Sequence, residues 1–509
     1  MRTVHSQELL GEGLSAPHGS DLPCALMGRP DVTIVWFKRD LRISDHRPLI
    51  AAAESGGPII PLYIAEPSIH TAEDAHPAHW DFVRSCLVPL RDDLAAIGAP
   101  LVVRIGEAVE VLEQLRLAHS VCRIVAHEET GNALTYSRDR AVLAWARTNR
   151  VEFGEAPNNA VVRRLSSRDD WSAVWRVRMG VPVAGAPDRL VPVDGIDIGP
   201  IPTGAELGLA THSREIQPGG TAAASELWAS FVRERHHGYQ TRMSSPLTAW
   251  DTCSRISPHL TYGTVSLRQI EQRLQRAKGR LGKGDPSGRA YRAFGERLHW
   301  HCHFIQKLED EPSIEHSSFV RDFDDVRQLD DEAKAEAWRT GNTGYPMVDA
   351  CMRALNSTGW INFRMRAMLV SFASYDLWQP WRSTGLHLAR AFTDYEPGIH
   401  WSQVQMQSGT TGINALRMYD PTKQAIEHDP DGEFIRQWVP ELRDVATSLI
   451  HQPGLAGANY PPPIVDHAAA VRRAGAEVQR IKKRAQATGR TAEVLERHGS
   501  RRPPPSRRR

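Results

Sequence analysis

The amino-acid sequence predicts an N-terminal α/β domain with a doubly wound parallel sheet, followed by an all-α C-terminal domain. From residue 31 onward, short uninterrupted apolar runs alternate with helix-length amphipathic segments, which is typical of a parallel sheet covered by helices on both faces. Beyond residue 223 the strand-like runs disappear and helical periodicity dominates. The 509 residues, of which 41% are hydrophobic and 24% charged, suffice for two such domains and exclude a mainly disordered chain.

Residues 1–30 are expected to form a flexible extension, because Gly, Pro, Ser and His follow one another there without any period. Gly11, Gly13 and Ala16 have the spacing of a dinucleotide-binding fingerprint. That fingerprint needs a strand before it and a helix after it, whereas no strand is expected here and Pro17 follows directly. We therefore interpret the match as chance.

The α/β domain is assigned to residues 31–165. Four apolar runs bounded by Gly, Pro or charged residues are the expected strands: Val32–Phe37, Ile59–Ile64, Leu101–Ile105 and Val121–Ala126. Three amphipathic segments are long enough for helices: 78–97, 107–118 and 137–149. Strands that alternate with helices build βαβ units, which predicts parallel pairing.

Residues 166–222 are expected to link the two domains, because they carry scattered Pro, Gly and Thr with little periodicity. The helical domain is assigned to residues 223–465. Its clearest helical periods are Leu260–Leu281, Arg289–Lys307 and Pro346–Leu355. The segment Trp360–Trp381 is apolar on nearly every side, which predicts one helix buried inside the domain.

Residues 466–509 are expected to form a basic, disordered tail. The whole chain has a formal net charge of +2, which taken alone argues against a nucleic-acid-binding protein. Residues 470–509, however, hold 13 Lys and Arg against three Glu, so the rest of the chain is negative by about eight charges. The tail is either a solvated extension or a source of additional phosphate contacts.

The six cysteines lie far apart and show no paired spacing, which excludes a disulfide framework and predicts a reducing, cytoplasmic environment without an iron–sulfur cluster. No run approaches ~20 apolar residues, and no signal peptide is evident, so no membrane partner is expected. One group of metal-ligand residue types occurs: His299, His301, Cys302 and His303. Since no second pair with ligand spacing accompanies it, no metal is expected.

Two arginines lie in the apolar segment Ile361–Val370. A buried guanidinium needs an anionic partner. Arg364 and Arg366 are two residues apart, so they point to different faces of a helix and are expected to serve different partners. Asp394 and Glu396 are candidate partners, as is a bound anion; on the residues alone, a structural ion pair is the simpler interpretation.

The segment Cys253–Pro258, followed by Tyr262 and Gly263, is a candidate anion site. Ser254, Arg255 and Ser257 offer two hydroxyls and a guanidinium beside the backbone N–H groups that precede a helix. Such a set suits a phosphate. A helix that begins with Ser257 as its N-cap explains Ser257 and Pro258, but it does not explain Ser254 and Arg255.

With these segments the sequence resembles the DNA photolyase/cryptochrome flavoprotein family over about residues 31–465. The motifs that carry the resemblance occur in the family's order: Val35–Arg42 with Asp45, Cys253–Pro258, Thr343–Pro346 with Asp349, Gly359-Trp360 with Arg364 and Arg366, and Asp429–Arg436 with Trp438 and Pro440–Leu442. The resemblance implies an α/β domain that can hold an antenna chromophore and a helical domain that buries FAD.

The resemblance further implies an FAD-dependent deoxyribodipyrimidine photolyase. Excited FADH⁻ would give an electron to a cyclobutane pyrimidine dimer flipped out of UV-damaged DNA, and the protein would act as a monomer. Two alternatives are a cryptochrome-type blue-light photoreceptor and, third, a (6–4) photolyase.

Positions carried over from the family give expected roles. The residues expected to contact the FAD phosphates and ribityl chain are Tyr239, Ser254, Arg255, Ile256 and Ser257. Residues expected around the flavin ring are Arg366, Asp394, Glu396 and His400. Trp300 is expected to stack on the dimer, and further DNA contacts fall to Arg242, Arg364 and Lys423.

The sequence departs from the family pattern at three positions near the expected reaction site. His400 stands where photolyases usually have the Asn that faces flavin N5, and Phe363 replaces another usual Asn. The Glu that hydrogen-bonds the dimer aligns with Arg297, and the adjacent Glu296 is expected to take its role.

The family's chain of three tryptophans also departs from the pattern. Trp381 remains, whereas the other two positions align with Val404 and Gln328. Photoreduction is therefore expected to be weaker or to use another route, for which Trp360, Trp378, Trp401, Tyr375 and Tyr395 are candidates. Around Glu128–Gly131, the acidic residue that often holds a folate in the family is not at its expected position. This argues against a folate antenna and leaves a deazaflavin, another chromophore or an empty pocket open.

Overall fold

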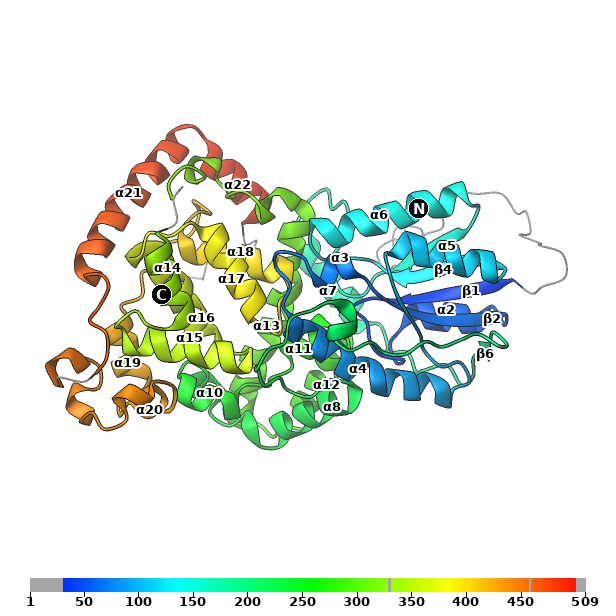
Figure 1. Ribbon diagram of the computed structural model, residues 1–509, viewed down its shortest axis with the longest axis horizontal. Coiled ribbons are helices and arrows are strands. Elements are labelled where there is room, and N and C mark those ends of the chain that lie inside the picture. The colour runs from blue at the N-terminus through cyan, green and yellow to red at the C-terminus, as the bar shows by residue number, and fades with distance from the viewer. Residues whose placement is uncertain (1–30, 328–330, 457–458, 500–509) are drawn as a thin grey trace.

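The computed structural model describes residues 31–327, 331–456 and 459–499, and these form an α/β domain and a helical domain side by side (Figure 1). The fold class predicted from the sequence is confirmed. The expectations for residues 1–30, for Gln328 and for the last ten residues lie outside the described part of the chain.

The α/β domain is built on a parallel sheet. Its strands are β1 Val32–Phe37, β2 Pro58–Ala65, β3 Val102–Ile105, β4 Val121–His127, β5 Glu152–Ala156 and the short β6 Val191–Pro192. The order is β3-β2-β1-β4-β5, with β6 paired to β2. The four predicted strands are confirmed; β5 went unpredicted because two of its five residues are Glu and it has no apolar run. The strand order reverses between β1 and β4, which is where open α/β sheets bind ligands.

Helices cover both faces of this sheet, as the doubly wound prediction requires (Figure 1). On one face, α2 Arg47–Glu54 and α4 Pro77–Ala96 share a core with Val35 and Phe37 of β1. On the other face, α5 Ala108–Ala118 and α6 Ala133–Thr148 pack on a core that includes Ile34 and Trp36. The alternation along β1 follows from the two-residue period of a strand.

The predicted linker is partly wrong, because its first part belongs to the helical domain. Helix α7 Trp171–Gly180 packs against α12 Leu267–Gly279, and its Trp171 and Trp175 join that domain's hydrophobic core. Residues 181–219 have little regular structure and run over the α/β domain, where Leu190 is buried. The linker therefore begins after α7, whose two tryptophans are buried in the helical domain.

After α7 and the stretch 181–219, the helical domain continues with α8 Thr221–Ser230 and the helices that follow it. These are α9 Tyr239–Arg242, α10 Pro246–Thr252, α11 Ser257–Thr261, α12, α13 Ser287–Asp310, α14 Glu332–Thr340, α15 Pro346–Thr358, α16 Phe363–Ser371, α17 Trp381–Ala391, α18 Pro397–Ser408, α19 Pro421–His428 and α20 Glu433–Trp438. The longest, α13, packs along α18. No helix within the described ranges is both long and apolar enough to span a membrane.

The predicted helix over 260–281 is two helices, α11 and α12. The break lies at Gly263, whose φ is +69° and whose position is so close to the α/β domain that a Cβ would lie 2.2 Å from the carbonyl oxygen of Arg39. A side chain there would be strained and would also push the two domains apart. The break in the helix is therefore required by domain packing.

The predicted single helix over Trp360–Trp381 is also wrong, although its burial is confirmed. Helix α16 passes into a π-helical turn at Phe372–Asp376, and the chain then leaves the helix before α17 begins at Trp381. Pro380 has no N–H to continue a helix and disfavours helical backbone at the preceding residue. Trp378, with φ of +58°, completes the break.

The expectation of a disordered tail is wrong for residues 467–498, which form α21 His467–Ala487 and α22 Arg490–His498. Ala474, Val478 and Ile481 are buried against the helical domain. Asp322 holds both helices, through Arg484 (Nε–Oδ1 3.0 Å) and Arg490 (Nη1–Oδ2 2.6 Å). The sequence interpretation counted the charges and missed the apolar stripe between them.

Candidate functional site

The two domains meet at the loop that follows β1. Arg39 Nη2 lies 2.5 Å from Glu396 Oε2, Arg42 Nη1 donates to the carbonyl of Gly263 at 2.9 Å, and Arg268 pairs with Asp45 at 2.8 Å. Glu396 was expected among the flavin contacts and as a partner of the arginines on α16. Its partner in the structure is an arginine of the other domain, so Glu396 fixes the domains together.

Arg366 and Asp394 form the ion pair that the sequence predicts. Arg366 Nη1 and Nη2 lie 2.9 and 3.0 Å from the two carboxylate oxygens of Asp394, and its Nε donates to the carbonyl of Ile361 at 2.8 Å. Burial opposes ionisation of Asp394, but Arg366 and a hydrogen bond from Ser257 hold its pKa below the ordinary value. Arg364 faces a different cavity, described below, which confirms that the two arginines serve different partners.

The segment before α11 is held in an unusual backbone conformation. Arg235 donates hydrogen bonds to the carbonyls of Cys253 and Ser254, while Arg255 has a φ of +58°. A non-glycine residue in this region is strained unless its surroundings hold it there. Gln217 does so, because it donates to the Arg255 carbonyl at 3.0 Å and accepts from its Nη2 at 3.1 Å. Helix α11 starts with Ser257 as its first residue and Ile256 as its N-cap, one position earlier than predicted.

Arg255 lies between two tryptophan rings. Its guanidinium carbon is 3.5 Å from the ring centre of Trp250 and 4.1 Å from that of Trp360. Trp360, expected to carry electrons, is therefore a stacking partner of the arginine. Burial lowers the pKa of Arg255 to about 9, and its buried Nε has no hydrogen-bond partner among the described residues.

The charges around this segment are predominantly positive. Four arginines lie close enough to lower the pKa of the Cys253 thiol electrostatically, against the larger effect of burial: Arg235, Arg255, Arg297 and Arg366. Asp394, the buried carboxylate beside them, is already paired with Arg366. A site with this excess of cations and a buried, unpartnered guanidinium N–H fits a diphosphate group well. We call Cys253–Ser257, with these arginines, the phosphate cradle.

Three further predicted site residues, Tyr239, Ile256 and His400, are buried. Tyr239 and Ile256 are buried in one hydrophobic cluster, where burial raises the pKa of the Tyr239 hydroxyl to about 12. His400, on α18, has its Nε2 2.9 Å from the carbonyl oxygen of Gly385. Burial lowers its pKa to about 4, so its imidazole is neutral at pH 7.

A cavity of about 450 Å³ opens beside the cradle. Its lining residues are Met243, Ser244, Arg297, Phe363, Arg364, Arg417, Met418 and Tyr419. Three arginines and several flat or polarisable side chains make it suitable for a stacked ring next to a negative charge. Arg297, which lines the cavity, interacts electrostatically with both Tyr239 and Cys253, so the cavity adjoins the cradle.

The predicted substrate residues are only partly in this cavity. Arg364 and Arg297 line it, whereas Glu296 and Trp300 do not. Trp300 is 44% exposed on α13, with its ring edge-on to Phe304 at 5.6 Å. Arg242, at the end of α9, and Lys423, on α19, are exposed at the surface. The expectation that Glu296 replaces the missing glutamate has no support in the lining, which contains no carboxylate.

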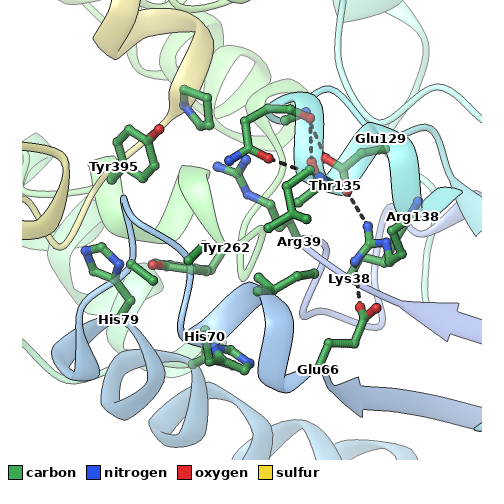
Figure 2. A pocket seen from close by; sticks show the side chains of 18 of the residues that line it. Lys38, Arg39, Glu66, His70, His79, Glu129, Thr135, Arg138, Tyr262 and Tyr395 are labelled. Atoms are coloured by element: carbon green, nitrogen blue, oxygen red, sulfur yellow. Dashed lines mark hydrogen bonds and ion pairs between the residues drawn. The ribbon is translucent and has the colours of Figure 1, made fainter. Parts of the chain in front are cut away.

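A second cavity, of about 140 Å³, lies between the domains at the carboxyl ends of β1 and β4 (Figure 2). Its Lys and Arg side chains are paired with carboxylates. Arg138 contacts Glu66 at 2.8 Å and Glu129 at 2.7 Å, while Lys38 pairs with Asp139 at 2.5 Å. The sequence motifs did not reveal this cavity; the signal that could have found it is the reversal of strand order at this edge.

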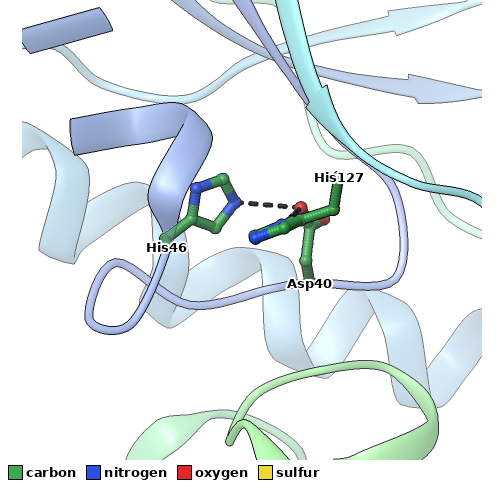
Figure 3. A group of neighbouring side chains, drawn as sticks. All are labelled: Asp40, His46 and His127. Atoms are coloured by element: carbon green, nitrogen blue, oxygen red, sulfur yellow. Dashed lines mark hydrogen bonds and ion pairs between the residues drawn. The ribbon is translucent and has the colours of Figure 1, made fainter. Parts of the chain in front are cut away.

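Asp40, His46 and His127 form a buried group in the α/β domain (Figure 3). His46 Nε2 and His127 Nδ1 lie 2.9 and 2.6 Å from one oxygen of Asp40. The other oxygen accepts from the backbone N–H of Lys38, and His46 Nδ1 accepts from that of Leu49. Each contact thus fixes the loop after β1 or the start of α2. In the group of possible metal ligands at 299–303, His299 and His303 both pack on Trp171. Arg168 Nη2 also lies 3.0 Å from His303 Nδ1.

The aromatic residues considered for electron transfer fall into two groups. Trp381 and Trp401 have ring centres 5.9 Å apart, and Trp401 is fully buried. Tyr375 and Trp378 lie elsewhere, both beside Arg327. Val404, at the position of a missing tryptophan, is buried in the same core as Trp381.

Both domains match families of known proteins. Residues 33–170 match the family described as DNA photolyase, and residues 294–480 match the FAD binding domain of DNA photolyase. A deoxyribodipyrimidine photo-lyase from Streptomyces griseus is 32% identical over 465 residues, which cover 86% of this chain and 97% of that protein. A cryptochrome DASH from Gloeobacter violaceus is 28% identical over 469 residues, covering 85% of this chain and 93% of that protein.

The fold is similar to that of a solved archaeal photolyase from Sulfolobus tokodaii that contains two FAD molecules. The TM-score is 0.75 at 26% sequence identity, over 88% of this chain and 100% of that chain. That structure is described as implying a novel light-harvesting cofactor. The similarity spans both domains of the present chain.

Proposed function

This chain belongs to the DNA photolyase/cryptochrome family, and from that premise we propose that it is a light-driven photolyase that splits cyclobutane pyrimidine dimers in DNA. The single observation that supports this most is the basic, aromatic cavity of about 450 Å³ beside the phosphate cradle. A sensor that only reduces its flavin needs no such cavity, whereas a repair enzyme must accept a flipped base next to the cofactor.

We propose that the phosphate cradle holds FAD. The family match supplies the cofactor class, and the residues present fit it: Arg235, Arg255 and the N-terminus of α11 would face the diphosphate, while Arg366 and Asp394 would flank the flavin ring. FAD, when bound and reduced, supplies under light the electron that opens the dimer. The protein's part is to orient the ring and exclude water from it.

In the cavity, Arg364 and Arg297 would contact the phosphates beside the flipped dimer. Phe363 in the lining, or the exposed Trp300 outside it, would offer an aromatic face. Arg297 stands where the resembling family has a glutamate. A cation there stabilises negative charge on the dimer carbonyl oxygens after electron transfer, a task that a carboxylic acid performs elsewhere by donating a hydrogen bond.

The interdomain cavity is our candidate for an antenna chromophore, since it lies at the carboxyl edge of the sheet where the strand order reverses. Its volume of about 140 Å³ admits only part of a large chromophore without movement of side chains. The chromophore's identity is left open. We also propose that the protein acts as a monomer in the cytoplasm.

A cryptochrome-type photoreceptor is the second candidate. The observation that favours it is the set of departures around the flavin, with His400 and Val404 in place of the family's usual residues. A (6–4) photolyase ranks third, because no pair of histidines lines the 450 Å³ cavity.

One experiment separates these candidates. The purified protein, with its flavin chemically reduced, is given oligonucleotides that contain a cyclobutane dimer or a (6–4) product, in blue light and in darkness. We expect restoration of the cyclobutane dimer in light only. Bound FAD without any repair would favour the photoreceptor, and repair of the (6–4) product alone would favour the third candidate.

A further inference from the structure

Helix α21, on the outside of the helical domain (Figure 1), separates its free cations from its acidic residue. Arg472, Gln479 and Lys483 are seven and four residues apart, so they share one exposed stripe of the helix. Glu477, the acidic residue of α21, lies on another side, where Arg480 pairs with it at 2.6 Å. Neither Arg472 nor Lys483 has an ion-pair partner among the described residues. We call the three residues of this exposed side the basic stripe.

The loop on which α21 packs also lines the cavity of about 450 Å³. Met418, in the loop between α18 and α19, packs against the buried side of α21 and lines the cavity as well. A Cβ on Gly475 of α21 would lie 3.5 Å from Met418 Cε. Lys482 Nζ donates to the carbonyl of Asn414 in the same loop at 3.1 Å. One side chain therefore separates α21 from the cavity.

The basic stripe lies next to the side of α21 that meets this loop. Gly475 and Lys482, which contact the loop, are seven residues apart and so lie on one side of the helix. Arg472 precedes Gly475 by three residues and Lys483 follows Lys482 directly, so each is turned from that side by only about 60–100°. The loop itself carries the exposed Arg417, which lines the cavity. The stripe thus continues the positive charge of the cavity along the surface.

We propose that the basic stripe of α21 binds the phosphate backbone of duplex DNA beside the lesion, whether or not a lesion is present. This proposal rests on the proposed function, because the flipped dimer would enter the cavity next to the stripe. Arg472 and Lys483 are eleven residues apart, which is about 16 Å along a helix. Phosphates on one strand of a duplex follow one another every 3.4 Å of its axis, so the stripe faces several of them at once.

The cavity and the stripe contribute to DNA binding in different ways. Contacts to phosphates carry no sequence or base information, whereas the cavity accepts a flipped nucleotide. The stripe therefore strengthens binding of damaged and undamaged DNA by the same factor. Residues outside 470–509 carry a net charge of about −8, so a duplex at the cavity needs cations nearby to offset repulsion. The stripe supplies them from the part of the chain where the positive charge is concentrated.

The test measures how the full-length, FAD-loaded protein binds a fluorescent duplex with and without a cyclobutane dimer, between about 50 and 200 mM salt. The variant carries Arg472→Gln and Lys483→Gln, which leave a good helix former at both positions. The control carries Arg140→Gln and Arg147→Gln, which remove the same charge from α6 in the other domain. These two arginines are exposed, seven residues apart, and without an ion-pair partner among the described residues. Thermal unfolding and flavin absorbance establish that all three proteins are folded and loaded alike.

For the Arg472→Gln, Lys483→Gln variant we expect a shallower dependence of affinity on salt. The slope of log K against log salt concentration should lose about 0.9 for each phosphate contact removed, and affinity at about 0.1 M salt should fall tenfold or more. The fall should be equal for the two duplexes, and the control should follow wild type. Unchanged affinity and slope overturn the proposal, as does an equal loss in the control. A loss confined to dimer-containing DNA also overturns it, because the residues would then belong to lesion recognition.

The proposed photolyase activity is tested separately, by light-dependent repair with wild type. If wild type repairs the dimer while the Arg472→Gln, Lys483→Gln variant binds DNA as tightly as wild type, only the role of the stripe is contradicted. If binding depends on the stripe but wild type restores no dimer in light, only the proposed function is contradicted.

Discussion

The phosphate cradle and the interdomain cavity handle charge in opposite ways. In the cavity, Arg138 and Lys38 are matched by the carboxylates of Glu66, Glu129 and Asp139. In the cradle, four arginines surround Cys253, and the carboxylate of Asp394 is committed to one of them. The cations of the cavity are therefore already paired with carboxylates, whereas the cradle has positive charge left over that suits an anion. The difference indicates which region depends on its ligand for stability.

The largest expected effect comes from Arg138→Gln in the cavity. The substitution leaves Glu66 and Glu129 buried without the cation that contacts both, and breaking a buried ion pair in this way costs about 3–5 kcal/mol. We expect the free energy of unfolding in urea to fall by this amount while the helical domain keeps its FAD. Loss of FAD with unchanged stability would reverse the comparison between the two regions.

The next largest effect is expected for Asp394→Asn in the cradle. Arg366 would lose its bidentate partner, and because its side chain is 23% exposed we expect the lower end of the range, about 3 kcal/mol. Unlike Arg138→Gln, this variant should also purify with much less FAD, which the flavin absorbance per chain measures. Full retention of FAD would show that Asp394 does not order the cofactor site.

The third prediction asks which aromatic side chain extends the cradle toward DNA. Trp300 stands at the family's stacking position, yet Phe363 is the one that lines the 450 Å³ cavity, and the two are similarly exposed at 44% and 45%. Loss of a stacked aromatic costs about 1–3 kcal/mol in binding. We expect Trp300→Ala to weaken binding to dimer-containing DNA by this amount, measured by fluorescence anisotropy against undamaged DNA. Phe363→Ala is the matched variant, and an effect confined to it would assign the stacking to Phe363.

Sequence reasoning found what depends on local pattern and missed what depends on partners. The strand Val32–Phe37 and the separate surroundings of Arg364 and Arg366 followed from spacing and apolarity. The choice of Asp394 as the partner of Arg366 needed the family resemblance as well. Glu396 was misassigned because its partner, Arg39, lies 357 positions away in the other domain. No local pattern signals a contact of that kind.

Dependence on distant partners also explains why the tail helices and the interdomain cavity were not predicted. The tail was expected to be disordered because its basic residues outnumber its acidic ones, but a helix needs only the small apolar stripe at Ala474, Val478 and Ile481 to pack. The interdomain cavity was missed because its lining is contributed by both domains. Strand order, rather than any motif, is the property that locates it.

The smallest effect is expected from His400→Asn, and it depends on pH. In the folded protein burial lowers the pKa of His400 to about 4, whereas an unfolded histidine titrates near pH 6.5. As the pH falls below 6.5 the unfolded chain therefore binds a proton that the folded chain does not, so stability decreases, and this decrease ends below pH 4. Between pH 6.5 and 5.5 this loss of stability amounts to about 1 kcal/mol, because the unfolded imidazole is already half protonated at pH 6.5.

In His400→Asn this term is absent, so the variant should lose about 1 kcal/mol less stability than wild type over that interval. The buried His79 and His127, whose pKa values are about 3, act equally in both proteins and cancel in the difference. Urea unfolding at a series of pH values measures it, with the exposed Lys423→Ala as the control that should follow wild type. Equal acid sensitivity of wild type and His400→Asn would mean that His400 is already open to protons in the folded state. The part of α18 around His400 would then be open to solvent, and the contrast between the two regions would be one of charge alone.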